Sequence, residues 1–82
     1  MSQKPERVLV ELAKLASEGQ RIGNYYIIDT TVKKVLERSE KPNTEEHQNY
    51  VRYKVQQFFP KSQISPGQGD NGGFIHLVVW SK

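Results

Sequence analysis

The chain has 82 residues, a formal net charge of +3 and no cysteine. A chain of this length supports one core, so we expect a single domain over residues 1–82 with no separate cofactor domain. The lack of cysteine excludes a disulfide framework and thiolate chemistry. The longest apolar run is far shorter than the ~20 residues that span a bilayer, and no signal-peptide pattern is present. We therefore expect no membrane partner and a cytoplasmic location, or the host cytoplasm if a virus encodes the chain.

The first third of the chain predicts a helix followed by a strand. Residues 5–20 place apolar side chains at helical spacing. Gly23 and Asn24 form a turn signal, and the aromatic and β-branched residues Tyr25 to Ile28 then predict a short strand. The apolar stripe of the first helix contains Val8, Leu12, Leu15 and Ala16.

Two more helices are predicted in the middle of the chain. The second starts from a cap at Asp29 or Thr30 and extends to about Ser39. The third follows a variant capping box, in which Asn43 would accept from first-turn amides, and extends to Phe59. The core stripe of this third helix is expected to contain Val51, Val55 and Phe58.

The remaining residues predict a hairpin. Lys61 to Ser65 is a weak strand, Pro66 to Gly73 is a glycine-rich loop, and Phe74 to Trp80 is the clearest strand of the chain. The predicted fold class is therefore α+β, with three helices and a short antiparallel sheet that ends in a Gly-rich hairpin, in the order α-β-α-α-β-β.

This order of elements resembles the winged helix-turn-helix domain. In that family the second and third helices form the helix-turn-helix, and the last two strands form the wing. The resemblance covers nearly the whole chain but has no residue signature, and the segment around Pro42 is longer than the usual turn. It implies a non-catalytic DNA-binding module, such as a small transcription regulator, whose third helix enters the major groove of double-stranded DNA.

The predicted outer face of the third helix suits this role. Amide side chains can pair with adenine edges and arginine with guanine edges, while tyrosine can donate to phosphate. Lysines flanking the helices and the glutamine in the wing would contact phosphate. The predicted nucleic-acid-binding residues are Lys33, Lys34, Asn49, Arg52, Tyr53, Lys54, Gln56, Lys61 and Gln68.

Two alternatives remain open. Glu45 and Glu46 place negative charge at the start of the third helix, and both faces of the last strand are largely apolar. These features favour a protein-interaction module, either a homodimer or an adaptor or inhibitor of another protein, with an interface at Phe74, Val78 and Trp80. The other alternative is a small single-strand-binding domain whose motif has a histidine four residues after an arginine; here Gln56 stands at that distance from Arg52.

The sequence predicts neither an enzyme nor a cofactor or metal protein. The two histidines, His47 and His76, are too few for a metal site without cysteine. The run Gly67-x-Gly69-x-x-Gly72 matches the dinucleotide fingerprint, but a strand follows it where that motif requires a helix. We expect His47 on the core side of its helix and His76 as a half-buried strand residue.

Overall fold

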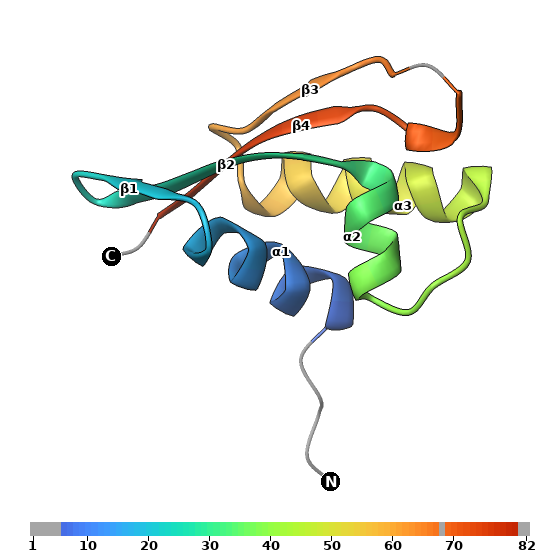
Figure 1. Cartoon of the computed structure of the whole chain (residues 1–82), viewed down its shortest axis with the longest axis horizontal. Coiled ribbons are helices and arrows are strands. Elements are labelled where there is room, and N and C mark those ends of the chain that lie inside the picture. The colour runs from blue at the N-terminus through green and yellow to red at the C-terminus, as the bar shows by residue number, and fades with distance from the viewer. Residues whose placement is uncertain (1–5, 68, 81–82) are drawn as a thin grey trace, which may run out of the picture.

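A computed structural model describes residues 6–67 and 69–80 of the chain (Figure 1). It confirms the α+β class, with three helices and a four-stranded antiparallel sheet. None of the helices in these ranges combines the length and the hydropathy of a membrane-spanning segment. The elements in chain order are α1 (Arg7–Ser17), β1 (Gln20–Ile22), β2 (Tyr25–Thr31), α2 (Val32–Arg38), α3 (Glu45–Phe58), β3 (Gln63–Ser65), the 3₁₀ turn η1 (Gly69–Asn71) and β4 (Phe74–Trp80).

The structure differs from the predicted boundaries around β2. The first helix ends at Ser17, and β1, which the sequence did not predict, forms a hairpin with β2. Gly19 permits this close approach, because a Cβ at that position would lie 2.3 Å from the backbone oxygen of Ile27. β2 continues to Thr31, so Thr31 rather than Asp29 or Thr30 caps α2, and its Oγ1 accepts a hydrogen bond from the Lys34 backbone N at 3.1 Å.

The sheet has the strand order β1-β2-β4-β3. β2 pairs with β4 along its whole length, from Tyr25 opposite Trp80 to Thr31 opposite Phe74. Directly opposed residues of antiparallel strands share a face. One face therefore carries Ile75 and Leu77 of β4, and the other carries Phe74, His76, Val78 and Trp80.

The helices cover only the first of these two faces (Figure 1). The core between helices and sheet is made of fully buried aliphatic side chains, which supply the main stabilisation of a domain this small. Polar contacts close its outer rim, where the buried Glu11 of α1 lies 3.4 Å from Arg38 Nε on α2 and 3.4 Å from Arg7 Nε. The core consists of Val8, Leu12, Leu15, Ala16, Val32, Val35, Leu36, Val51, Val55, Ile75 and Leu77.

Candidate nucleic-acid interface

The start of α3 is fixed by a side-chain cap. Thr44 has extended backbone, and its Oγ1 accepts a hydrogen bond from the backbone N of His47 at 3.2 Å. The capping residue is therefore Thr44, and the prediction of Asn43 was wrong by one position. Asn43 Oδ1 instead accepts from Gln48 Nε2 at 2.6 Å. The His47 ring is half-buried, with Nδ1 2.9 Å from Thr44 Oγ1, so this histidine belongs to the start of the helix.

The outward side of α3 is lined by Asn49, Tyr53 and Gln56, which are all exposed. They follow the i, i+4, i+7 spacing of one helical side. Tyr53 is 57% exposed. We call these three residues the amide row, after the two amide side chains of Asn49 and Gln56. The structure thus leaves three of the predicted base- and phosphate-contacting residues of α3 accessible to solvent.

Arg52 lies beside the amide row, and its guanidinium is directed to the glycine-rich loop. Its Nε donates to the backbone oxygen of Gly72 at 3.0 Å, and its Nη2 donates to the same oxygen at 2.5 Å. Its Nη1 donates to Asn49 Oδ1 at 2.6 Å. Arg52 is half-buried and connects the loop to α3, whereas the sequence had placed it on the outer face as a reader of guanine.

The glycine-rich loop between β3 and β4 is also attached to α2. The backbone N of Val32 donates to the oxygen of Gly73 at 3.0 Å. Gly73 has φ +121°, and a Cβ there would lie 2.9 Å from the backbone oxygen of Ser65, so this position requires glycine. The loop is therefore held against both helices of the predicted helix-turn-helix. Gln68, the predicted contact at the tip of the loop, lies outside the described residues.

The predicted phosphate-binding lysines divide between two places. Lys33 and Lys34, in the first turn of α2, line a pocket that also contains Asp29 and Glu37. Lys61, in the turn after α3, lies 5.7 Å from the ring centre of Tyr25. In Figure 1 the start of α2 and the turn after α3 lie well apart along the sheet. Lys33 and Lys34 are therefore separated from Lys61, with acidic side chains beside them.

Lys54 is surrounded by aromatic rings. Its Nζ lies 5.3 Å from the ring centre of Tyr50, 6.0 Å from that of Tyr53 and 5.2 Å from that of Phe58. Such cation–π contacts are individually weak, and the half-buried Lys54 side chain is long and flexible. Lys54 can therefore reach a phosphate beside the amide row.

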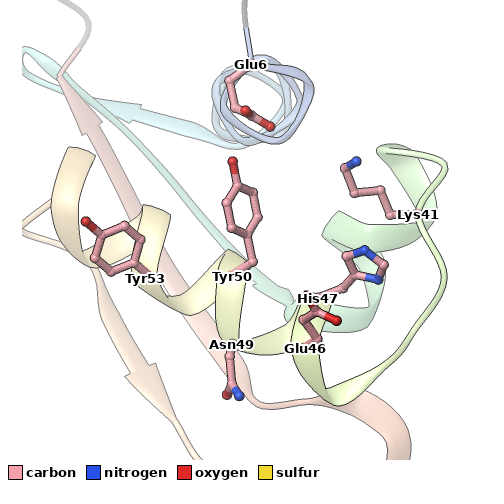
Figure 2. Close-up of a pocket in the computed structure, with 7 residues that line it drawn as sticks. All are labelled: Glu6, Lys41, Glu46, His47, Asn49, Tyr50 and Tyr53. Atoms are coloured by element: carbon pink, nitrogen blue, oxygen red, sulfur yellow. The ribbon is translucent and has the colours of Figure 1, made fainter.

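A pocket lies between α1 and α3 (Figure 2). It has a volume of about 540 Å³, and Tyr50 crosses it with its hydroxyl directed toward Glu6, while Asn49 points to the opposite side of α3. Burial raises the pKa of the Tyr50 hydroxyl, and a hydrogen bond with Glu6 raises it further. The hydrogen bond between Tyr50 of α3 and Glu6, the N-cap residue of α1, thus connects these two helices across the pocket. Within residues 6–67 and 69–80, no group of three or more His, Asp or Glu side chains could hold a metal ion.

The open face of the sheet carries the residues predicted as an interface. Phe74 and Trp80 are 49% and 56% exposed, and Val78 is half-buried between them. α1 packs on the other side of the sheet (Figure 1). His76 is exposed rather than half-buried, and its Nδ1 lies 2.8 Å from Asp29 Oδ1.

The positions of some aromatic residues were not predicted correctly from the sequence. Phe58 was expected in the core stripe of the third helix but is 49% exposed, and Phe59 packs against the core in its place. Tyr25 meets Trp80 edge to face, with ring centres 4.9 Å apart. The pairing of β2 with β4 creates this contact, so no local sequence pattern indicates it.

Comparisons with protein-family models, with curated proteins and with solved structures find no match for this chain. Function is therefore inferred from its side chains and their geometry.

Proposed function

We propose that this chain is a non-catalytic nucleic-acid-binding module that contacts double-stranded DNA through α3, in the manner of winged helix-turn-helix regulators. The observation that carries the proposal is the solvent-facing amide row of Asn49, Tyr53 and Gln56 on the helix that precedes the β3–β4 hairpin. The order of elements and the attachment of the glycine-rich loop to α2 and α3 support the same assignment.

Each side chain then has a definite role. Asn49 and Gln56 would read adenine edges in the major groove, and Tyr53 would donate to a phosphate. Arg52, whose donors contact Gly72 and Asn49, would position the loop and the Asn49 amide. Lys54 would contact phosphate beside the helix, and Lys61, Lys33 and Lys34 would strengthen binding through longer-range attraction.

The test uses a labelled duplex selected from a random-sequence pool, titrated at several salt concentrations. We expect the logarithm of the affinity to fall linearly with the logarithm of the salt concentration. The variant Gln56→Ala should weaken binding to the selected duplex by about tenfold or more, because a bidentate amide–adenine contact contributes about that factor. Gln20→Ala is the matched control, since Gln20 is an exposed amide on β1. A binding curve without salt dependence would refute the proposal.

A second candidate function is a protein-interaction module that uses the open face of β4. The observation in its favour is the exposure of Phe74 and Trp80 on a face that none of the described helices covers. Exposed aromatic side chains are frequent anchors in protein interfaces. Sedimentation of the pure protein with and without duplex DNA separates the two candidates, because a stable dimer that is indifferent to DNA favours the second.

A further inference from the structure

One end of the open sheet face carries a group of aromatic rings and lysines. Phe58, Lys61, Tyr25 and Trp80 line one pocket of about 170 Å³, which Phe59, Pro60 and Val78 complete. Lys54 extends this surface along α3, because its Nζ lies 5.2 Å from the ring centre of Phe58. We define the aromatic–lysine strip as Lys54, Phe58, Lys61, Tyr25 and Trp80.

The strip combines segments that are distant in sequence. In Figure 1 the end of α3, the turn into β3 and the end of β4 lie at the same end of the sheet. Phe58 and Trp80 are 49% and 56% exposed, so both keep much of their ring surface in solvent. Lys61 lines the same pocket, and its Nζ lies 5.7 Å from the ring centre of Tyr25.

We propose that the aromatic–lysine strip binds single-stranded nucleic acid, with unpaired bases stacking on Phe58 and Trp80 and phosphates contacting Lys54 and Lys61. Single strands are bound in this way because every base has a stacking face and the backbone carries one negative charge per nucleotide. Duplex DNA does not suit the strip, since its bases are stacked on one another and leave no face free. The proposal goes beyond the function above, because it needs neither a duplex nor the amide row.

The charges around the strip favour nucleic acid over an apolar partner. Both lysines face aromatic rings through weak contacts, so each ammonium can leave its ring to a base and follow the adjacent phosphate. The other end of the same open face lacks this pattern. There Phe74 lines a pocket with Asp29, Thr31, Ser65 and His76. A phosphate chain is therefore attracted to the Trp80 end.

The intrinsic fluorescence of Trp80 provides a direct test, because the chain has one tryptophan. Oligo(dT) and oligo(rU) of about ten nucleotides, a length within the range of single-strand sites, would be titrated into the intact protein. We expect both to quench Trp80, and a stronger effect of one of them would identify DNA or RNA as the preferred strand. The duplex used above should leave the fluorescence unchanged.

Matched variants locate the site. Phe58→Ala should weaken oligo(dT) binding by about tenfold, as expected for one lost stacking contact, while Phe74→Ala, equally exposed at 49%, should leave the affinity unchanged. Lys61→Gln should lower the salt slope by about 0.7, whereas Lys34→Gln should not. Trp80→Phe, which keeps a ring, should bind oligo(dT) in an anisotropy assay, and circular dichroism checks that each variant is folded.

Several outcomes would overturn the proposal. They are an absence of quenching by both oligonucleotides, equal weakening by Phe58→Ala and Phe74→Ala, or burial of Trp80 in a protein dimer that oligonucleotides do not alter. The failure of this proposal and that of duplex binding are distinguishable. Gln56→Ala should affect only the duplex titration, and Phe58→Ala should affect only the single-strand titration.

Discussion

The two faces of the sheet differ although both are rich in apolar side chains. On β4, Ile75 and Leu77 are 1% and 0% exposed, whereas Phe74 and Trp80 on alternate positions are 49% and 56% exposed. The difference comes from the helices, which cover one face and leave the other open. Large apolar residues thus stabilise the fold on the inner face, while those on the outer face remain accessible to a ligand.

Among substitutions that test the difference between the two faces, the largest loss of stability is expected at Leu77. Leu77→Ala should lower the free energy of unfolding by about 2–5 kcal/mol, because it removes buried methyl groups and leaves a cavity. Phe74→Ala, on the outer face of the same strand, should lower it by less than about 1 kcal/mol. Urea denaturation followed by circular dichroism measures both. Equal losses would mean that another molecule covers the outer face and that the two faces do not differ.

The sequence predicted the backbone order well because local patterns specify it. The apolar run Phe74–Trp80 was predicted with the bounds that the structure has, and the third helix ends one residue before its predicted end at Phe59. β1 was missed because Gln20 and Arg21 are polar and its pairing depends on β2. The alternation in β4 showed two apolar faces, but only the position of the helices determines which of them is open.

The candidate site was less predictable, since it depends on tertiary contacts. Helical periodicity gave the exposed positions Asn49, Tyr53 and Gln56. It also placed Arg52 in solvent, whereas a loop twenty residues further along the chain supplies its acceptor at Gly72. Phe58 and Phe59 are adjacent apolar residues at the end of a helix. Helical periodicity placed Phe58 in the core, whereas the structure turns Phe58 outward and packs Phe59 against the core.

A smaller loss of stability is expected where Arg52 of α3 holds the glycine-rich loop. Arg52→Met should lower the free energy of unfolding by about 1–3 kcal/mol, because the half-buried oxygen of Gly72 loses both its donors. Hydrogen exchange of the backbone amides at Gly72 and Gly73 should accelerate. Lys54→Met is the matched control on the same helix, since its ammonium makes weak ring contacts with Tyr50 and Phe58 and none with the described residues of the glycine-rich loop, and it should change neither quantity appreciably. Unchanged exchange in Arg52→Met would show that the loop is held by other contacts.

The smallest effect is expected at the outer rim of the helical layer, where Arg38 of α2 donates to both carboxylate oxygens of Glu18 at 2.9 and 2.8 Å. The hydrogen bond from Arg38 is the main reason that the pKa of Glu18 is lowered. The charged form is therefore favoured in the folded state. Its contribution to stability is present above the ordinary pKa of about 4.5 and is lost as the pH falls through the lower, folded value.

Glu18→Gln should consequently be slightly less stable than the parent near neutral pH. The difference should shrink as the pH falls below about 4.5 and vanish below the lower pKa of the folded state. Thermal unfolding at a series of pH values measures it. In a background that already carries Arg38→Gln, the substitution should produce a much smaller pH-dependent difference, because only the weaker attraction of Lys34 remains. A pH-dependent difference of undiminished size in that background would assign the effect to a partner other than Arg38. Neither substitution should alter Trp80 fluorescence or oligonucleotide binding, because Glu18 and Arg38 belong to the helical layer on the covered side of the sheet.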